Sequence, residues 1–590
     1  MSKFYEVRTR DGAARIGKLM LNGGMQTETP RMLRVEREEE LAVVGVEDAN
    51  FNELASEETW HAPRGTVLLP EVHPLVTKLG TNTLYVDFFV LAFASSMLRS
   101  PRDFVRRIID ARNAIPPDVA LWVPAIATVE NAALLFYMGV DIIDETNAVI
   151  KGYQDIYQME EGESSLSKLE DLPCTCPICT ALSIDEFQGT ARKTRAVLLA
   201  RHNSLLLAKE VKKTRVSIRA GGLREYVEQK VRASSFLTAV LRILDLQEAR
   251  YFERRTPVAR NRSMKVNTME SLKRIEVKRF SSRVLNRYEP PAREILLILP
   301  CSARKPYSRS NSHMKFIDTI ADYRGHIHEV ILTSPLGVVP RELEAVYPAA
   351  FYDIPVTGYW DAEEREWVSS CLRAYLKKNQ NNYEVVVAHL RGAYKDICAG
   401  VAADLGVELV FTCESNSNER LTSKEALNRL KERITCAGRK RLSSFEEKAS
   451  MLKAMADYQM GLGAGNELVA REAGEKLGIT GKFPYYKLIS NKEVLARIVP
   501  QYGVLALTVR AARRISNLNS YYRVEIGDFV PAGSILAPGV LNADPQIRVN
   551  DEVVFWGEKA FGVGRAKMSG WEMVQSRRGM AVQVRAVEVS

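Results

Sequence analysis

Short apolar runs of strand length alternate with amphipathic helical segments in two long stretches, residues 1–260 and 291–435. This alternation constrains the fold more than any other feature of the sequence. Residues 295–299 (Ile-Leu-Leu-Ile-Leu) form one such run, and residues 104–112 carry apolar side chains at helical spacing. Strands that are apolar throughout and separated by helices are typical of parallel sheets covered on both faces. We therefore predict a multidomain α/β protein.

The intervening and terminal segments differ in composition. Residues 261–290 are polar and strongly basic and end at a Pro-Pro pair, which predicts a basic linker. Residues 436–515 predict a small α+β domain. From residue 516 to 590, short alternating stretches are broken by glycine and proline, which predicts a small β-barrel. Residues 1–260 are expected to form a parallel sheet, open or closed into a barrel, and residues 291–435 a doubly wound sheet.

The overall composition excludes several classes of protein. No run of about 18 uncharged apolar residues occurs, so we expect no spanning helix and no membrane association. The first ten residues contain no apolar signal core, which favours a cytoplasmic protein. Eight cysteines in 590 residues are too few for a disulfide scaffold. The net charge of +10 is compatible with a nucleic-acid partner, but equally with a solvated basic surface.

A metal site is predicted where three cysteines fall within six residues. Cys174, Cys176 and Cys179 are followed 23 positions later by His202, on a helix expected over residues 184–207. Zinc takes four tetrahedral nitrogen and sulfur ligands, and this set supplies them. Four protein ligands leave no open position, so the expected zinc is structural. The alternative is a group of buried unpaired thiols beside a surface histidine.

Residues 300–313 (Pro-Cys-Ser-Ala-Arg-Lys-Pro-Tyr-Ser-Arg-Ser-Asn-Ser-His) directly follow the apolar run 295–299. Ligands of open parallel sheets bind at the carboxyl ends of strands, so a site is expected in this loop. A thiol near cationic groups has its thiolate favoured and becomes a better nucleophile. The candidate catalytic residues are Cys301, Lys305, Tyr307, Ser310 and His313, with Arg304 as a candidate for substrate binding. The residues alone fit equally well a polar loop whose serines cap the next helix.

Polar and aromatic side chains follow other predicted strands at the same edge. They are candidates for substrate binding: Arg341, Glu342, Asp361 and Arg391. Tyr359 and Trp360 suit stacking on a planar base, or ordinary loop packing. An arginine here holds a phosphate or carboxylate, or forms a surface salt bridge. Arginines around the terminal barrel suit phosphate-backbone contacts, or a solvated face.

Taken together, these residues resemble the archaeosine synthase family, which is paralogous to archaeal tRNA-guanine transglycosylase. Residues 300–313 match the pattern Pro-Cys-x3-Lys-Pro-Tyr-x2-Ser-x2-His, which looks like the family signature, and residues 333–344 and 352–364 look like its flanking blocks. The resemblance covers nearly the whole chain. The glycine framework of residues 533–569 looks like that of a PUA domain, which implies RNA binding.

The amino-terminal third is similar to the transglycosylase barrel. Cys174, Cys176, Cys179 and His202 match its zinc cluster. Asp144 lies where the resemblance puts the nucleophilic aspartate, and it is also a candidate for substrate contact. Residues 89–96 read Phe-Val-Leu-Ala-Phe-Ala-Ser-Ser, without the aspartate and glycine pair of the family's base-exchange block. Covalent exchange needs a nucleophile and an acid-base partner together, so this domain is expected to keep the fold and tRNA contacts but not base exchange.

The resemblance implies a transferase of archaeosine biosynthesis that acts on position 15 in the D-loop of tRNA. It adds nitrogen from free lysine, or from glutamine or ammonia, to the nitrile of 7-cyano-7-deazaguanine. A radical-SAM partner subunit then cleaves a lysine adduct, and a homodimer or hetero-oligomer is expected. Cys301 attacks the nitrile first, or the amine attacks directly; His313 or Lys305 supplies the proton, and Tyr307 or Ser310 orients the base. The competing hypotheses are an active transglycosylase and a non-catalytic tRNA-binding subunit.

Overall fold

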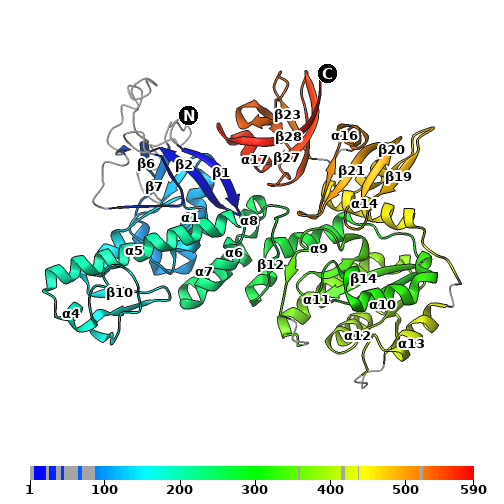
Figure 1. The fold of residues 1–590 in the computed structure, drawn as a ribbon, viewed down its shortest axis with the longest axis horizontal. Helices are drawn as coiled ribbons and strands as arrows, with labels where there is room; N and C mark the ends of the chain where they lie inside the picture. Colours follow the sequence, from blue (N-terminus) through cyan, green and yellow to red (C-terminus); the bar gives the residue numbers. More distant parts are fainter. Residues whose placement is uncertain are drawn as a thin grey trace. The chain divides into compact units, whose positions relative to one another are not determined.

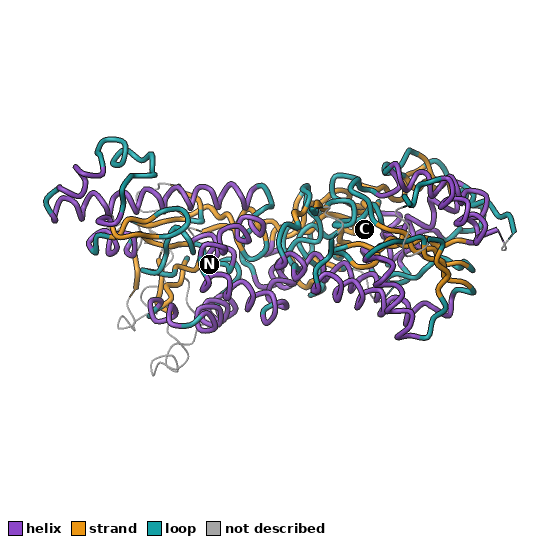
Figure 2. Tube along the Cα trace, turned by 90° about the horizontal axis from the view of Figure 1, so that it is seen from below, coloured by secondary structure: helices purple, strands orange, loops and turns teal. Residues whose placement is uncertain are grey.

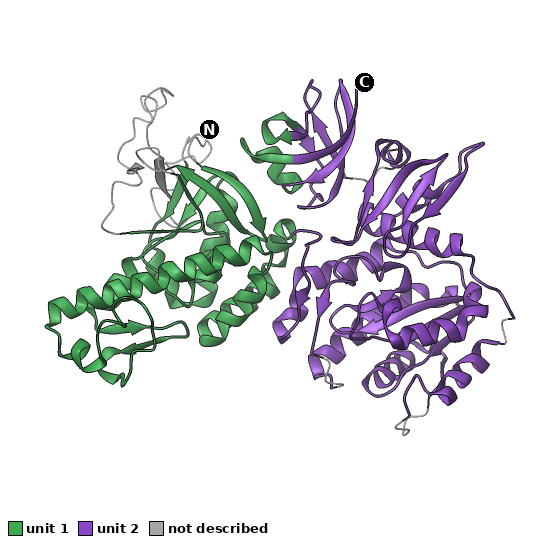
Figure 3. Ribbon diagram, in the orientation of Figure 1, with its two compact units in different colours: residues 1–256, 535–540, 568–581 green, residues 257–534, 541–567, 582–590 purple. Residues whose placement is uncertain are grey.

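The structure is a computed structural model, and it describes residues 5–20, 26–34, 42–44, 64–68, 87–355, 359–413, 419–435, 438–516, 518 and 522–589. The chain divides into two compact units (Figure 3). Unit 1 contains residues 1–256, 535–540 and 568–581, and unit 2 contains residues 257–534, 541–567 and 582–590. None of the helices in the described ranges combines the length and the apolar character that crossing a membrane requires.

Unit 1 contains a sheet of six parallel strands in the order β4-β9-β8-β7-β6-β5. The strands are β4 (Arg31–Leu33), β5 (Ala42–Val44), β6 (Arg64–Leu68), β7 (Phe88–Leu91), β8 (Ala120–Trp122) and β9 (Ile142–Asp144). Helix α1 (Pro101–Ala114) begins at Ser100, whose hydroxyl accepts hydrogen bonds from the first-turn amides. Its apolar stripe, with Phe104 and Ile108 fully buried, follows the predicted helical spacing. The parallel α/β architecture predicted for this part of the chain is confirmed.

The 28-residue helix α5 (Arg192–Arg219) runs along unit 1 (Figures 1 and 2). It packs against α3 (Thr146–Tyr153) and against the antiparallel strands β1 (Tyr5–Asp11) and β2 (Ala14–Met20). The contact with α3 is close because residue 152 is glycine; a Cβ there would lie 2.8 Å from the Cβ of Ala200.

The single helix expected over residues 184–207 is two helices, α4 (Ile184–Gly189) and α5. Thr190 has an extended backbone between them. The guanidinium of Arg195 donates to the carbonyl oxygens of Gln188 and Thr190, each at 3.1 Å. These bonds satisfy carbonyls that a continuous helix would have used internally, so the break is stable.

The main sheet of unit 2 has the order β15-β14-β13-β17-β18. Four strands are parallel: β13 (Ile295–Pro300), β14 (Ile327–Thr333), β17 (Val385–Ala388) and β18 (Leu409–Phe411). The edge strand β15 (Gly337–Pro340) is antiparallel to β14. The chain places β14 on one side of β13 and β17 on the other, so the strand order reverses at β13. In open parallel sheets, ligands bind beside the carboxyl ends of the strands at such a switch point, here those of β13 and β17.

Helices cover both faces of this sheet, as the all-apolar strands predict. Helices α10 (Asn311–Ile320) and α13 (Lys424–Ile434) pack on Leu297 and Leu299. Leu296 and Ile298 point to the opposite face and are equally buried. Helix α11 (Ala362–Asn379) packs against β14, β15 and α12 (Ala393–Leu405). The doubly wound prediction is confirmed.

The prediction of a basic linker at residues 261–290 is wrong. This segment forms β12 (Met264–Lys265), a 3₁₀ turn and helix α9 (Ile275–Arg287), in which Val277 and Phe280 are fully buried. The positive charges misled the prediction because several of them are buried and paired; Arg274 donates to the carboxylate of Glu276 at 3.0 Å. Strand β12 pairs in parallel with β16 (Tyr352–Asp353).

Two smaller sheets follow the doubly wound sheet in the sequence, and most of the second belongs to unit 2 (Figure 1). The first is antiparallel: β19 (Leu477–Thr480), β20 (Lys487–Ser490), β21 (Glu493–Val499) and β22 (Val504–Leu507), with helices α14 (Ser444–Met460) and α16 (Val509–Ile515) against it. The second contains β23 (Arg523–Ile526), β26 (Glu552–Trp556), β27 (Ala560–Ala566) and β28 (Met580–Val589). The predicted α+β segment and the predicted short-stranded terminal segment therefore both contain antiparallel sheet.

Candidate functional site

Four potential metal ligands converge in unit 1. One ligand atom from each of Cys174, Cys176, Cys179 and His202 lies within 4.8 Å of all the others. The Nδ1 atom of His202 lies 3.4 Å from the Cys176 sulfur and 3.3 Å from the Cys179 sulfur. Its Nε2 lies 3.0 Å from the carbonyl oxygen of Gln158, which accepts the Nε2 proton and leaves Nδ1 free to bind a metal. A compact set of three sulfurs and one imidazole fits a four-coordinate metal ion.

Cys301 is the first residue after β13, at the switch point of the unit 2 sheet. Its side chain is half-buried, and its sulfur lies 2.9 Å from the hydroxyl of Tyr394. Tyr394 is in the first turn of α12, the helix that follows β17. The segments that follow β13 and β17, the two strands at the switch point, therefore each contribute one residue of this pair.

Lys305 and two tyrosines lie on the same side of the loop. The Lys305 ammonium lies 3.9 Å from the centre of the Tyr352 ring. The Tyr352 hydroxyl lies 2.7 Å from both the Tyr307 hydroxyl and the Thr333 hydroxyl. Burial lowers the pKa of Lys305, and the neighbouring Cys301 opposes that shift. Burial, followed by the field of Cys301, raises the pKa of Tyr307.

Ser310 and His313 have structural partners in this arrangement. The Ser310 hydroxyl caps α10 by accepting from the amide of His313 at 3.3 Å. The fully buried His313 ring lies 2.9 Å from the Pro300 carbonyl oxygen through Nε2, and 2.9 Å from Arg341 through Nδ1. Burial and the adjacent Arg341 lower the pKa of His313 to about 3. The ring is therefore neutral near pH 7 with both nitrogens engaged, which corrects the expectation that it supplies a proton.

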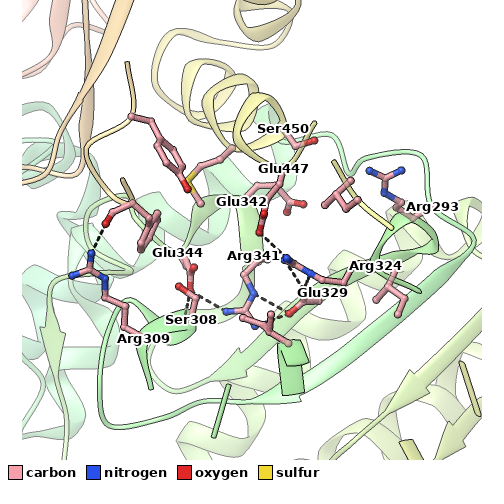
Figure 4. Close-up of a pocket in the computed structure, with 16 residues that line it drawn as sticks. Arg293, Ser308, Arg309, Arg324, Glu329, Arg341, Glu342, Glu344, Glu447 and Ser450 are labelled. Atoms are coloured by element: carbon pink, nitrogen blue, oxygen red, sulfur yellow. Dashed lines mark hydrogen bonds and ion pairs between the residues drawn. The ribbon is translucent and has the colours of Figure 1, made fainter. Parts of the chain in front are cut away.

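Arg341 lies in a buried ionic network rather than facing solvent (Figure 4). It donates to Glu329 at 2.7 Å and to Glu344 at 2.9 Å. Burial alone would raise the pKa of Glu329, but Arg341 and Arg324 hold it at about 2. Glu342 accepts a hydrogen bond from Tyr288 at 2.9 Å. Arg341 and Glu342, which were predicted to bind substrate, therefore both have protein partners, because the fold brings residues that are distant in the sequence next to them.

This network lines a cavity of about 300 Å³ in unit 2 (Figure 4). Ser308 and Arg309 from the loop of residues 300–313 lie on one side of it, and Phe483 and Tyr486 from the segment that precedes β20 contribute to another. Cys301 and Lys305 are not among its lining residues. The hydrogen bonds from Arg341 through His313 to the Pro300 carbonyl connect the wall of this cavity to the residue that precedes Cys301.

The remaining candidates in unit 2 lie farther toward the surface or have capping roles. The Asp361 carboxylate caps α11 by accepting from the amide of Glu364 at 2.9 Å, within a capping box. Arg391 is exposed and donates to the carbonyl oxygen of Glu419 at 3.1 Å. Arg304 is exposed in the signature loop. The sequence Glu-Ser-Asn-Ser at residues 414–417, which also follows an apolar run, lies outside the described residues.

Asp144 ends strand β9 in unit 1 and is almost fully buried. Its carboxylate accepts from the indole of Trp122 at 3.0 Å and from the amides of Ala125 and Thr146 at 3.1 and 3.0 Å. A carboxylate saturated by such donors is a poor nucleophile. The geometry therefore gives Asp144 a structural role at the strand end.

Sequence reasoning missed Tyr394 and gave Tyr352 no role. Tyr394 follows Gly392, whose backbone has φ 54°, a conformation that favours glycine. Its ring packs edge-on against Trp360 with centroids 4.6 Å apart. The switch-point rule was the available signal, because it also directs attention to the loop after β17.

Four family models match the chain. Residues 78–235 match queuine tRNA-ribosyltransferase, and residues 277–434 match a domain of unknown function. Residues 450–521 match the patch-forming domain C2 of tRNA-guanine transglycosylase, and residues 524–587 match the PUA domain. The chain therefore combines transglycosylase-like and PUA segments with the doubly wound domain that contains Cys301.

Curated relatives extend this similarity to the full length. The chain is 42% identical to archaeosine synthase subunit alpha of Methanosarcina acetivorans and 38% identical to archaeosine synthase of Haloferax volcanii; each match covers 100% of both chains. It is 27% identical to the tRNA-guanine(15) transglycosylase of Methanothermobacter thermautotrophicus, over 82% of this chain and 68% of that protein. With this identity over full length, the chain belongs to the archaeosine synthase family.

Proposed function

We propose that this chain is a tRNA-modifying transferase of archaeosine biosynthesis, which adds an amine nitrogen to the nitrile carbon of 7-cyano-7-deazaguanine at position 15 in the D-loop. The relatives named archaeosine synthase support the reaction class. One observation carries the chemistry: Cys301 lies half-buried at the switch point of a parallel sheet, where open α/β sheets bind ligands, with Lys305 and tyrosines beside it.

In the proposed reaction, the Cys301 thiolate attacks the nitrile carbon. A carbon–sulfur bond forms, one π bond of the nitrile breaks, and its electron pair goes to nitrogen, which takes up a proton. The incoming amine then adds to the thioimidate carbon, loses a proton and expels the thiolate, leaving an amidine. The positive charge of Lys305 favours both the thiolate and the developing charge on nitrogen.

The other residues of the signature loop hold this geometry. Ser310 fixes the start of α10, and His313 anchors the Pro300 carbonyl next to Cys301. The linked hydroxyls of Tyr307, Tyr352 and Thr333 form one wall behind Lys305. Trp360 is buried against Tyr394 on the segment before α11, and the exposed Tyr359 beside it is proposed to stack on a purine-like base.

The metal in unit 1 is proposed to be a structural zinc ion, held by Cys174, Cys176, Cys179 and His202. All four positions are filled by protein, so this ion supplies no open coordination site for chemistry. The PUA and transglycosylase-like segments are proposed to hold the tRNA, chiefly through phosphate contacts favoured by the net charge of +10.

The test is to incubate the purified chain with nitrile-bearing tRNA and with lysine, glutamine or ammonium separately, and to determine the masses of the digested nucleosides. An amidine product with one donor is expected. A thioimidate adduct trapped on Cys301 supports the covalent route, whereas full activity of Cys301→Ala excludes it and leaves direct amine attack. Cys398→Ala, at a buried thiol of α12, is the control for loss of a cysteine. Exchange of labelled guanine without any amidine would instead identify a transglycosylase.

A third outcome separates catalysis from delivery. If Cys301→Ala, Lys305→Met and wild type all support product formation equally when a second enzyme is added, while the chain alone forms none, the chain is a tRNA-binding subunit and the proposal fails.

A further inference from the structure

The contact between Tyr394 and Cys301 is the most specific polar contact at the proposed reaction centre. The hydroxyl oxygen and the sulfur are 2.9 Å apart. Within the described part of the chain, this hydroxyl is the one hydrogen-bond partner of the Cys301 sulfur. The contact joins the loop after β13 to the helix after β17, so it bridges the two segments that flank the switch point, where the nitrile is proposed to bind.

The Tyr394 ring is held in place independently of Cys301. Trp360 packs edge-on against it at a centroid separation of 4.6 Å, and the tyrosine lies in the first turn of α12. The hydroxyl therefore reaches the sulfur from a fixed ring rather than from a mobile side chain. Such preorganised donors stabilise developing charge without reorganisation at the moment of reaction.

The hydrogen bond runs from Tyr394 to Cys301 once the sulfur is a thiolate, because only the phenol then carries a proton. Burial, and then the nearby Cys301, raise the pKa of Tyr394, so the phenol keeps its proton. Within the described residues, the charge of Cys301 also acts on the pKa of Lys305, Tyr307 and Tyr352, and Glu364 faces Tyr394. With a neutral phenol and a cation nearby, the arrangement favours an O–H donor to a thiolate acceptor.

We propose that the Tyr394 hydroxyl is the proton donor of this centre: it donates to the Cys301 sulfur when that sulfur is a thiolate, and it protonates the nitrile nitrogen when the carbon–sulfur bond forms. This inference rests on the proposed function. As sulfur attacks carbon, the Tyr394 O–H bond breaks and an N–H bond forms, leaving a tyrosinate. The attacking amine then gives its proton to that tyrosinate as the carbon–nitrogen bond forms and the thiolate leaves. No oxidant, reductant or further reactant is needed.

The other candidates for proton transfer are engaged elsewhere. His313 is neutral and has both ring nitrogens in hydrogen bonds to Pro300 and Arg341. The Tyr307 hydroxyl is hydrogen-bonded to the Tyr352 hydroxyl. The Lys305 ammonium lies over the Tyr352 ring. We therefore assign Lys305 the electrostatic role and Tyr394 the proton transfer to the nitrile nitrogen.

The decisive variant is Tyr394→Phe, which removes the hydroxyl and keeps the ring against Trp360. Two readouts are needed. The first is the single-turnover rate of amidine formation on nitrile-bearing tRNA, expected to fall by about 100-fold, the usual contribution of a positioned proton donor. The second is the rate of alkylation of Cys301 by iodoacetamide as a function of pH, measured on the isolated peptide by mass spectrometry. At pH 7 this rate is expected to fall by about tenfold, because a hydrogen bond that favours the thiolate is lost.

The matched control is Tyr485→Phe, at an exposed tyrosine between β19 and β20, which is expected to behave as wild type in both assays. Circular dichroism of each variant confirms folding. An alkylation profile of Tyr394→Phe that superimposes on wild type overturns the inference, whatever happens to turnover. Unchanged turnover overturns it as well.

Failure of the proposed function is distinguishable from failure of this inference. Alkylation needs neither tRNA nor amine, so it reports on the Tyr394–Cys301 pair even if wild type forms no amidine. In that case the reaction would be wrong, and a shifted profile would still support Tyr394 as the donor to the thiolate.

Discussion

Arg341 donates a hydrogen bond to Nδ1 of His313 across 2.9 Å, while Nε2 of the same ring donates to the Pro300 carbonyl. The arginine follows β15, the histidine lies on α10, and the proline ends β13, so one imidazole joins three elements behind Cys301. His313, which the sequence suggested as a proton donor, thus connects these elements through buried hydrogen bonds. Its consequences for stability and pH dependence can be measured.

Replacing His313 by glutamine is expected to lower the free energy of unfolding by about 1–3 kcal/mol, because buried groups of Arg341 and Pro300 lose their partner. The pKa of His313 is about 3 in the folded chain. Between that value and the ordinary histidine pKa, the unfolded chain therefore binds a proton on His313 that the folded chain does not bind. Wild-type stability should therefore decrease as pH falls from about 6.5 toward 3, more steeply than that of the variant. Urea titrations at several pH values test this, and parallel curves would contradict it.

Removing one cysteine of the unit 1 cluster should remove the metal. Cys176→Ser is expected to lose bound zinc, measured by mass spectrometry of the metal content, and to unfold at a lower temperature than wild type. Cys398→Ala changes a buried thiol outside the cluster and should keep its metal. A full zinc content in Cys176→Ser would argue against the assigned ligand set.

Lys305→Met keeps much of the packing over the Tyr352 ring but removes the charge. Alkylation of Cys301 at pH 7 should slow by about tenfold, because a nearby cation favours the thiolate, and amidine formation should fall with it. Lys315→Met removes an exposed charge from α10 and is the matched control. Equal alkylation rates in the two variants would show that Lys305 does not act on the thiol.

Binding of tRNA should weaken steeply with salt. If about six phosphates are contacted, affinity falls by about 1,000-fold between 50 and 200 mM salt. Filter binding at four salt concentrations measures the slope, and tRNA without the nitrile should give nearly the same slope because the phosphates are unchanged. An affinity that is insensitive to salt would rule out phosphate contacts as the main source of binding.

Wild-type protein is expected to exchange no labelled guanine into tRNA, because the Asp144 carboxylate is occupied by Trp122, Ala125 and Thr146. Asp144→Ala leaves those donors without an acceptor and should destabilise unit 1 by about 1–3 kcal/mol. Urea unfolding measures the loss. Guanine exchange by wild type that disappears in Asp144→Ala would restore a nucleophilic role.

Local patterns predicted the elements that carry the site. The apolar run before Cys301 is strand β13, and the spacing of three cysteines and a histidine matches a cluster within ligand distance. Each of these two predictions depends on residues that lie within a short stretch of sequence or on one helix. The hydrogen-bond partner of the Cys301 sulfur is instead Tyr394, which lies 93 residues away in the sequence, and no local pattern marks that contact.

Charge was the less dependable guide. The arginines of residues 261–290 suggested a solvated linker, yet Arg274 is buried against Glu276 and Phe280 is buried in α9. Arg341 suggested a substrate contact, yet Glu329 and Glu344 neutralise it. A sequence does not reveal which carboxylate a distant guanidinium will meet, so paired and unpaired cations look alike until the fold is known.

The parallel pairing of β12 with β16 has a practical consequence for dissecting the molecule. Met264 and Lys265 align with Tyr352 and Asp353, and Tyr352 is the ring beneath Lys305. A shortened polypeptide that begins at residue 277, where the family match starts, would lack the neighbour that fixes this tyrosine. Any attempt to express the cysteine-bearing half alone should begin upstream of Met264.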